Sequence, residues 1–245
     1  MITIERNWLS FGFYGIPLCL LAALLVTSLA RANEPHMGVI SIVIKTDLGA
    51  INADLYPDLA PITVANFVYN IKEGLYRHGQ FYRIVCRDGP TSPSKKRLSL
   101  IQGGKALDKK SRPPIAHEST RTTGLSHIDG VFSMASNGPG TASSEFFISI
   151  GENTILDYLN GKRVNDQDEP GAYPGFAAFG KVTNGMDIVR QIQNLPTGQR
   201  VLTAQEAALV ETGVIPKWML PQILNNSVSI TIELAPSQKI EEETR

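Results

Sequence analysis

The segment SEFFISI, residues 144–150, places two phenylalanines, Phe146 and Phe147, side by side in a run typical of a β-strand. A loop rich in glycine, serine, threonine and asparagine precedes it, and a second apolar run, FGKV, follows at residues 179–182. Neighbouring side chains of a strand point to opposite faces of the sheet. The two rings therefore face different surroundings, and the question is whether Phe147 lines a pocket or is only buried.

Working outward from this segment, short strand-like runs recur along the chain, separated by turn residues. The runs GVISIVIKT (38–46) and AINADLY (50–56) are joined by the turn DLG and predict a hairpin. The last run, VSITIEL (228–234), alternates polar and apolar residues. The other predicted strands are QFYRIV (80–85), LSLIQ (98–102), GVFSMA (130–135), FFISI (146–150) and FAAFGKV (176–182).

Two segments, residues 61–74 and 185–195, have the apolar spacing of amphipathic helices. About eight short strands with two main helices favour a closed barrel or a sandwich, and helices that do not follow every strand argue against a parallel α/β sheet. An eight-stranded barrel is filled by its own side chains, so its site would lie at a mouth or on the outer wall. Thr203 and Glu206 have the spacing of a capping box and predict a further short helix. We expect this helix to cover a rim of the barrel; the alternative is that it contacts a partner.

The N-terminal residues have the features of an export signal. A basic Arg6 precedes the apolar stretch 11–29, and the run ARA at 30–32 fits the small-x-small cleavage pattern. We therefore predict a signal peptide over residues 1–32, followed by a linker over residues 33–37. The alternative is an uncleaved anchor, because the apolar stretch approaches the length that spans a bilayer. In both cases the rest of the chain is delivered across a membrane.

The composition suits one globular domain with extensions. Of the 245 residues, 42% are hydrophobic, and 23 basic residues balance 23 acidic ones, so neither a nucleic-acid-binding face nor a polybasic membrane patch is predicted. Cys19 lies within the signal, which leaves Cys86 alone after cleavage and excludes an intrachain disulfide. We expect Cys86 to be buried or half-buried.

Sequence motifs for metal, nucleophilic or nucleotide chemistry are absent: there is no HExxH, CxxC, GxSxG, GxGxxG or P-loop. The histidines show no spacing typical of metal ligands, and we expect them to be exposed or to cap other elements; they are His36, His78, His117 and His127. We therefore predict no metal and no cofactor. The protein either only binds, or it catalyses a reaction that needs neither a nucleophile nor a proton transfer.

The motifs FYRIV, LIQGG, FSMASNGPGTASSEFFISIG, LD and FAAFGKV, in this order, strongly resemble the cyclophilins, which are peptidyl-prolyl cis-trans isomerases. The sequence looks most like their bacterial exported branch. The resemblance extends from the strand at Gly38 to the helix at 185–195 and includes the closing strand at Val228. It implies a mainly β fold over residues 38–235, a closed eight-stranded antiparallel β-barrel capped by two α-helices, with a groove for X-Pro segments on its outer face.

The resemblance also implies the residues of the site. Arg83 falls on the family's catalytic arginine, Gln102 on the glutamine that binds the substrate backbone, and Phe147 on the floor of the proline pocket, while Phe146 points to the core. Leu156 falls on an apolar pocket wall, and Ala135 and Ser136 on the stretch that pairs with the substrate main chain. Phe81 falls on a neighbouring core position, and Ile155 stands where many eukaryotic members have a tryptophan.

The chain departs from the family pattern at three predicted insertions, residues 86–99, 158–175 and 197–224, and in a polar tail, residues 236–245. By register, Ser99 and Leu100 take the places of a pocket aromatic and a methionine. Leu100 can still pack there, but Ser99 cannot replace a ring, so we expect a shallower pocket unless an insertion residue fills it. Glu145 replaces the usual glutamine before the paired rings, and we predict that it accepts a hydrogen bond from Arg83.

These observations predict an exported, monomeric prolyl isomerase of the periplasm that acts on proline-containing polypeptides. The alternative is a chaperone or scaffold that binds X-Pro segments with little turnover; a metal enzyme is a distant third. No nucleic-acid partner is expected, and contact with a membrane is expected only through an uncleaved N-terminal segment.

Overall fold

The computed structural model describes residues 38–87, 98–106, 109–159, 174–213 and 215–236. The predicted signal peptide and linker, most of the first two insertions and nearly all of the polar tail lie outside the described residues. The strands are β1 (Ile40–Thr46), β2 (Gly49–Leu55), β3 (Gly79–Arg87), β4 (Leu98–Gly104), β5 (Val131–Met134), β6 (Phe146–Ser149), β7 (Ala177–Asn184) and β8 (Ile223–Leu234). The helices are α2 (Pro61–Lys72), α3 (Thr120–Thr123), α4 (Met186–Gln193) and α5 (Ala204–Glu211), with the 3-10 helices η2 (Thr154–Leu156) and η3 (Lys217–Gln222).

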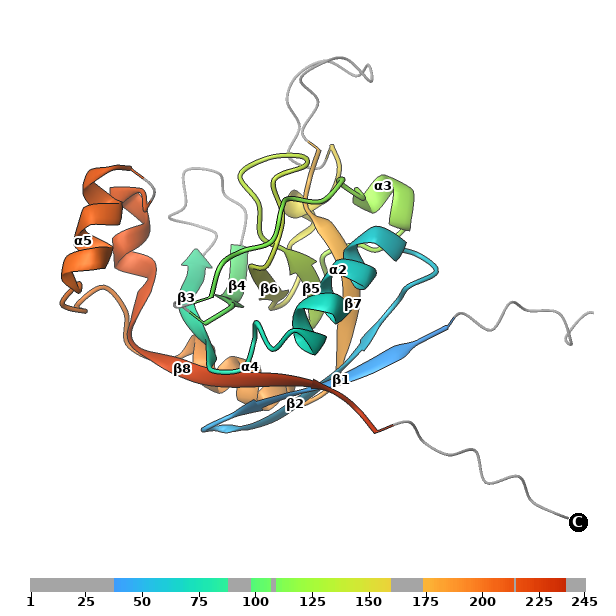
Figure 1. Ribbon diagram of the computed structural model, residues 1–245, viewed down its shortest axis with the longest axis horizontal. Helices are drawn as coiled ribbons and strands as arrows, with labels where there is room; N and C mark the ends of the chain where they lie inside the picture. The colour runs from blue at the N-terminus through green and yellow to red at the C-terminus, as the bar shows by residue number, and fades with distance from the viewer. Residues whose placement is uncertain (1–37, 88–97, 107–108, 160–173, 214, 237–245) are drawn as a thin grey trace, which may run out of the picture. The chain divides into compact units, whose positions relative to one another are not determined.

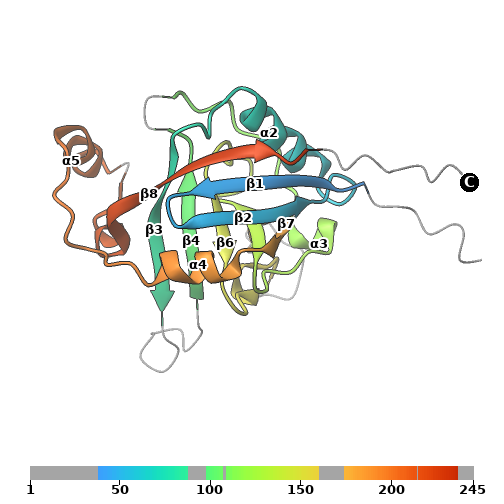
Figure 2. The ribbon, with the colours of Figure 1, turned by 90° about the horizontal axis from the view of Figure 1, so that it is seen from below.

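The eight strands close into a barrel in the order β1-β2-β7-β5-β6-β4-β3-β8. Every neighbouring pair is antiparallel. The mainly β fold, a closed eight-stranded antiparallel barrel, is therefore confirmed. Helices α2 and α4 lie at opposite ends of the barrel, as Figures 1 and 2 show.

The barrel interior is filled by apolar side chains that alternate along the strands. Phe67 of α2 enters it, and its ring lies 4.9–6.5 Å from four other aromatic rings, those of Tyr76, Phe132, Phe146 and Phe179. From the other end, Val189 and Ile192 of α4 are fully buried against the same core. The two helices therefore close the barrel ends by burying apolar surface, the main favourable contribution to folding.

The C-terminal extension forms a helix where the sequence predicts one. Helix α5 begins after Thr203, whose side chain accepts from the backbone N–H of Glu206, and the Glu206 carboxylate accepts from the Thr203 backbone in return. The capping box is thus confirmed. In Figures 1 and 2, however, α5 stands to the side of β3 and β8 rather than over an opening of the barrel, so the expectation that it covers a rim is wrong. The openings are already closed by α2 and α4.

Two further expectations are wrong. Cys86 is exposed and is the next-to-last residue of β3, at an end of the strand. His127 is fully buried rather than exposed, since its ring nitrogens find partners inside the protein, as described below.

Helix α2 lacks a capping residue of its own, because Ala60 occupies the N-cap position. Glu118, buried at 7% exposure, supplies the cap from a distant loop. Its carboxylate accepts from the backbone N–H groups of Ile62 and Thr63, at 3.1 and 2.8 Å, and from the Thr63 hydroxyl at 2.7 Å. A carboxylate at a helix N-terminus satisfies unpaired donors and complements the helix dipole.

We expect Glu118→Ala to lower the free energy of unfolding by about 1–3 kcal/mol, because it leaves buried N–H donors without an acceptor. Urea denaturation of the variant and the wild type measures the difference. Glu152→Ala, at an exposed position, serves as the control and should change stability little. Equal denaturation midpoints for Glu118→Ala and the wild type would show that the cap does not stabilise α2.

Candidate functional site

Four strands bring a row of side chains to the outer wall of the barrel. Arg83 on β3 pairs with Gln102 on β4, Gln102 pairs with Phe147 on β6, and Phe147 pairs with Ser133 on β5. Directly opposed residues of neighbouring strands point to the same face of a sheet. Since Phe146, next to Phe147 on β6, is fully buried in the barrel core, this row faces outward. Arg83 and Phe147 therefore share one face of the molecule.

A second, smaller group of apolar side chains lies on this outer face, and we call it the outer apolar cluster. Its buried members are Val85, Leu100, Phe147 and Leu156, and the half-buried side chains packed against them are Leu98, Ala135, Ile155 and Phe176. The rings of Phe147 and Phe176 meet edge to face at 5.5 Å. Phe147 is only 3% exposed, so it forms the floor of the cluster and the half-buried side chains form its rim.

The Arg83 guanidinium is fixed by two amide side chains. Its Nη1 donates to Gln102 Oε1 at 2.7 Å, while Nε and Nη2 donate to Gln222 Oε1 at 2.9 and 2.6 Å. The guanidinium carbon also lies 5.4 Å from the centre of the Trp218 ring. The acceptors of these three bonds are neutral amide oxygens, which orient the guanidinium.

Gln102 is itself oriented by a second line of hydrogen bonds. Its Nε2 donates to the Tyr82 hydroxyl at 2.7 Å, and that hydroxyl bonds to the Glu145 carboxylate. Gly104, the second glycine of LIQGG, makes room for this arrangement, because a Cβ at that position would lie 2.0 Å from a carboxylate oxygen of Glu145. The sequence predicted a direct hydrogen bond from Arg83 to Glu145, whereas these contacts connect the two residues through Gln102 and Tyr82.

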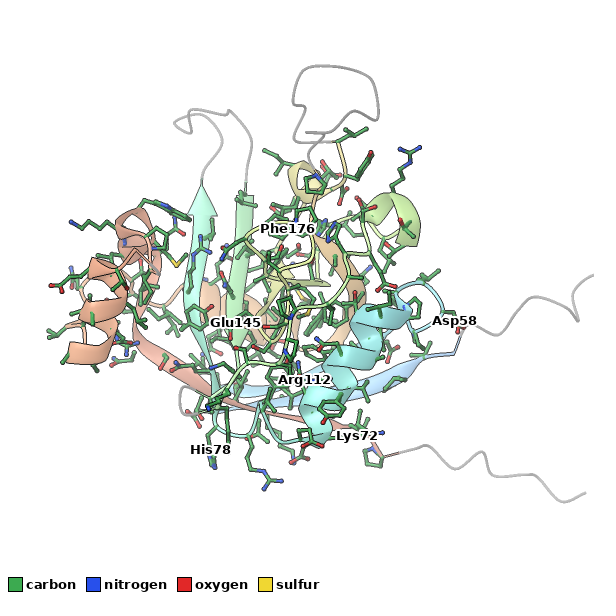
Figure 3. The ribbon with its side chains drawn as sticks, turned by 45° about the horizontal axis from the view of Figure 1, so that its top comes forward. Asp58, Lys72, His78, Arg112, Glu145 and Phe176 are labelled. Atoms are coloured by element: carbon green, nitrogen blue, oxygen red, sulfur yellow. The ribbon has the colours of Figure 1, made fainter. Side chains whose placement is uncertain are left out.

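Burial dominates the electrostatics of this second line. Desolvation raises the pKa of the Tyr82 hydroxyl well above its usual value, and the nearby Glu145 carboxylate raises it further. Desolvation also raises the pKa of Glu145, although the bond from Tyr82 and the charge of Lys105 partly oppose this. Figure 3 labels Glu145 among the side chains in front of the central strands.

His127 supports the floor of the cluster from behind. Its ring is fully buried and stacks on Phe147 with the ring centres 5.7 Å apart. Its Nδ1 lies 2.5 Å from Asp157 Oδ1 and its Nε2 lies 2.9 Å from Ser133 Oγ. Although burial alone would raise the pKa of Asp157, the hydrogen bonds from His127 and Ser126 lower it on balance.

The side chains of Ser133, His127 and Asp157 are hydrogen-bonded in series, as in the catalytic triad of an acyl-transfer enzyme. Here, however, Ser133 is fully buried, so no substrate carbonyl can reach its hydroxyl. The three side chains instead satisfy one another's polar atoms beneath an apolar floor, and they hold the Phe147 ring in place.

The other predicted residues fall into three places. Leu100, Leu156, Ala135 and Ile155 belong to the outer apolar cluster, and Ser136 is half-buried next to Ala135. Phe81 is fully buried in the barrel core, with its ring 5.7 Å from that of Phe146. Ser99 does not join the outer cluster, because its backbone pairs with the Asn153 side chain and its hydroxyl accepts from Gln193 of α4.

Several residues of the site were missed in the sequence. Val85 and Leu98 could have been found, because they lie two residues from Arg83 and Leu100 on the same strands and so share the outward face. Phe176, at the start of a predicted strand, carried no signal of its own. Trp218 and Gln222 come from the C-terminal extension, and Gln222 is 139 residues from Arg83, so no local pattern could connect them.

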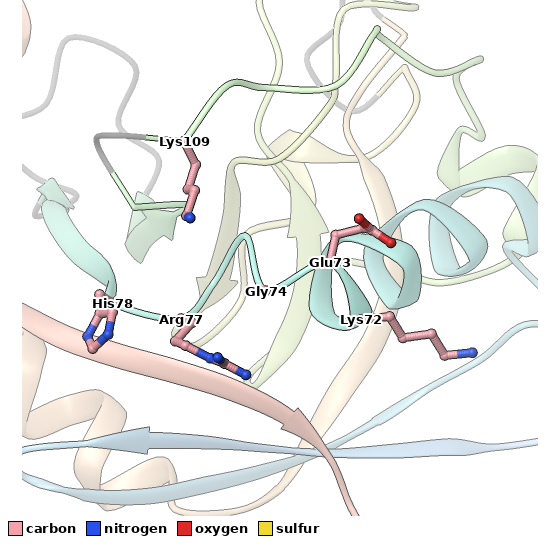
Figure 4. Close-up of a pocket in the computed structure, with 6 residues that line it drawn as sticks. All are labelled: Lys72, Glu73, Gly74, Arg77, His78 and Lys109. Carbon is pink, nitrogen blue, oxygen red and sulfur yellow. The ribbon is translucent and has the colours of Figure 1, made fainter.

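A separate hollow of about 310 Å³ lies beside the C-terminal end of α2 (Figure 4). Its lining is polar or charged apart from one glycine, and comprises Lys72, Glu73, Gly74, Arg77, His78 and Lys109. Without an apolar side chain, this hollow does not suit a proline ring. Across the described part of the chain, no group of three or more His, Cys, Asp or Glu side chains could hold a metal, and no helix has the length and apolar character needed to cross a membrane.

Comparisons with known proteins identify one family of relatives. Residues 41–214 match the family model described as cyclophilin type peptidyl-prolyl cis-trans isomerase/CLD. The chain is 33% identical over 182 residues to a peptidyl-prolyl cis-trans isomerase of Acinetobacter baylyi, covering 72% of this chain and 81% of that protein. It is 29% identical over 163 residues to peptidyl-prolyl cis-trans isomerase B of Escherichia coli, covering 64% of this chain and 87% of that protein.

The fold is similar to crystal structures of a cyclophilin-type peptidyl-prolyl cis-trans isomerase from Cryptosporidium parvum. The TM-score is 0.52 at 18% sequence identity, and the match covers 81% of this chain and 100% of the other. A second structure of that protein, determined in the presence of the dipeptide Ala-Pro, matches with a TM-score of 0.52 at 18% identity, over 80% of this chain and 99% of the other.

We expect Glu145→Gln to keep Arg83 positioned but to change how stability depends on pH. The raised pKa means that the folded protein holds the Glu145 proton more tightly than the unfolded chain, so this contribution to stability is full at low pH. It is lost as the pH rises from the ordinary glutamate value through the raised one. The variant cannot ionise at this position, so it should gain stability relative to the wild type over that window, by about 1.4 kcal/mol per unit of pKa difference.

Urea denaturation of both proteins between pH 4 and pH 8 measures this effect. A stability difference that stays constant over the range would show that Glu145 titrates normally. In activity assays, Glu145→Gln should remain largely active, while Glu145→Ala should be less active because Tyr82 loses its acceptor.

Proposed function

This chain belongs to the cyclophilin-type family of peptidyl-prolyl cis-trans isomerases, and we propose that it accelerates rotation about X-Pro bonds in exported polypeptides with Arg83 as its catalytic residue. One observation carries the proposal: the Arg83 guanidinium and the outer apolar cluster lie on the same outward face, joined by Gln102. A cation with several donors thus stands beside an apolar surface that suits a prolyl ring.

The chemistry needs no nucleophile and no net proton transfer. Rotation of the X-Pro bond breaks amide resonance over a barrier of about 18–20 kcal/mol, and the proline nitrogen becomes pyramidal as the amide twists. A donor beside that nitrogen or the prolyl carbonyl favours the twisted amide over the planar one. Arginine suits this role, because it stays charged and presents its donors in a fixed fork.

The required energy is within reach of such a site. A thousandfold acceleration needs a barrier about 4 kcal/mol lower. One well-aimed donor in a water-poor site is worth about 3–4 kcal/mol. Arg83 meets the condition for a well-aimed donor, because Gln102 and Gln222 fix the plane of its guanidinium before substrate arrives. Little reorganisation is then needed during the reaction.

The outer apolar cluster grips the proline while Gln102 binds the substrate backbone. The rim side chains, among them Phe176 and Ile155, are half-buried and offer apolar contact to a small ring. Ala135 at the rim of the cluster and Ser136 next to it bind the main chain of the residues next to the proline. The Cryptosporidium protein crystallised in the presence of Ala-Pro supports a substrate of this kind.

Export is part of the proposal. The basic Arg6, the apolar stretch at 11–29 and the small residues at 30–32 support a signal peptide that delivers the barrel to the periplasm as a monomer. The clients are then proteins that fold or mature outside the cytoplasm, where slow X-Pro isomerisation limits folding. An uncleaved segment would instead leave the barrel anchored at the membrane.

One observation favours a second function, an X-Pro-binding chaperone or scaffold with little turnover. Phe147 is 3% exposed, so the floor of the cluster leaves a proline ring little depth. A shallow grip would bind X-Pro segments without holding the ring firmly while the amide twists.

We expect Arg83→Ala to lower kcat/KM on an Ala-Pro peptide by about 100- to 1000-fold, because it removes the aimed donor. Arg83→Lys should restore little, since lysine lacks the planar fork. A coupled isomerisation assay measures both variants. Arg190→Ala is the matched control, because Arg190 is an exposed arginine paired with Asp129 on another part of the surface. An inactive wild type, or a fully active Arg83→Ala, would favour the binding function.

We also expect the exported protein to begin at Asn33, because cleavage follows the run ARA at 30–32. N-terminal sequencing of protein recovered from the periplasm tests this. Protein that keeps its N-terminus and sediments with membranes would instead indicate an anchor.

A further inference from the structure

The C-terminal extension, residues 197–224, returns to the barrel at the site. Its base is closed by a bridge between Thr197 and Leu224 and by a bond from the Gly198 N–H to the Ile223 carbonyl at 2.9 Å. Ile223 begins β8 and pairs with Arg83 of β3. The preceding η3 helix is therefore held next to Arg83 by the register of the barrel itself.

Two side chains of η3 contact the guanidinium. Gln222 accepts both the Nε and Nη2 donors through a single oxygen, and Trp218 places its ring 5.4 Å from the guanidinium carbon. An arginine beside the face of a tryptophan is a favourable cation–π arrangement. This contact positions Trp218 next to Arg83, with the ring facing the guanidinium.

Trp218 is nevertheless 58% exposed, an unusual state for the largest apolar side chain. The Arg83 guanidinium lies over the ring, and more than half of the residue remains exposed to solvent. A large exposed aromatic next to a catalytic group is a surface suited to a ligand, since aromatic anchors dominate binding energetics. No neighbouring aromatic is supplied by β4, where Ser99 bonds to Gln193 and Asn153 instead.

We propose that the extension supplies two parts of the active site: Gln222 is a positioning residue for Arg83, and Trp218 is a specificity-determining wall that favours substrates with an aromatic or large apolar residue close to the proline. This inference rests on the proposed isomerase function and goes beyond it, because it assigns the substrate class. It also assigns a role to a segment outside the barrel strands.

The geometry sets how close that substrate residue must be. The site runs across neighbouring strands, from Ala135 and Phe147 through Gln102 to Arg83 and then to η3. Strands lie about 4.8 Å apart and an extended peptide advances about 3.3 Å per residue, so a chain crossing the strands from Phe147 to Trp218 covers a few residues. With the prolyl ring on the cluster and its bond beside Arg83, a side chain one or two positions away reaches Trp218, on the side away from Ala135.

Trp218 is tested by comparing peptides rather than by activity alone. Isomerisation is followed by NMR exchange, which needs no protease, on Ala-Ala-Pro-Ala-Ala and on versions with phenylalanine one or two positions before or after the proline. The wild type should prefer a phenylalanine on one side of the proline by about threefold to tenfold in kcat/KM. Trp218→Ala should reduce this ratio to about 1, and Trp218→Phe should retain most of it.

Val201→Ala is the matched control, because Val201 is an exposed apolar residue of the same extension, at 90% exposure, and should keep the wild-type ratio. A wild type that isomerises all the peptides equally well, or a Trp218→Ala variant with an unchanged ratio, would overturn the proposed role of Trp218. A wild type that isomerises none of them would overturn the isomerase function itself, so the two failures are distinguishable.

Gln222 is tested through rescue and the division between kcat and KM. Gln222→Ala should lower kcat about tenfold with little change in KM, since the substrate contacts remain while the donor is less well aimed. Gln222→Asn should retain part of kcat, because its shorter amide still offers a neutral oxygen to the guanidinium. A purely structural role would instead give equal losses for both variants, in step with a loss of thermal stability, and would overturn the positioning role.

Discussion

The alternation of side chains along the strands is the constraint on which this site depends. A closed eight-stranded barrel has no free interior, since Phe67, Phe132, Phe146 and Phe179 pack it with aromatic rings. Side chains of the strands that bind a ligand must then lie on the outer face, at positions that alternate with the core-facing ones. Phe146 and Phe147 are adjacent residues that face opposite sides of the barrel wall. The Phe146 ring packs in the core, and the Phe147 ring forms the floor of the outer apolar cluster.

The same alternation places the outer apolar cluster and the charged Arg83 side chain on one face of the barrel wall. Arg83, Gln102, Phe147 and Ser133 come from four neighbouring strands, so their relative positions are set by backbone hydrogen bonds rather than by flexible loops. Two of them have further support. Tyr82, next to Glu145, orients Gln102 by a hydrogen bond, and the ring of His127 stacks on Phe147. A site built on strands with such support keeps its geometry without a bound ligand, which is what a reaction driven by electrostatic preorganisation needs.

Short-range periodicity predicted a barrel or a sandwich, and the resemblance to the cyclophilins, carried by motifs in a fixed order, implied the closed barrel and the site residues Arg83, Gln102 and Phe147. Arg83, Gln102 and Phe147 each sit in a strand whose register the motifs define. Sequence reasoning was less successful with buried polar groups. His127 has no metal-ligand spacing, which predicts an exposed or capping side chain, whereas the ring is buried and Ser133 and Asp157 satisfy both of its nitrogens. Ser99 was read as a gap in the pocket, because register alone does not show that its side chain turns toward α4.

The C-terminal extension shows why long-range contacts lie beyond such reasoning, and what they change. Its helix α5 was predictable from a capping box, which is a local signal, but the position of η3 depends on where β8 pairs with β3. Once that pairing is made, Gln222 and Trp218 have little freedom to avoid Arg83, since Ile223 lies directly opposite it. A segment that appears in the sequence as a departure from the family thus places two side chains against Arg83. In the function proposed here, the barrel would supply the residues that twist an X-Pro bond, and η3 would add the contacts that select among polypeptides.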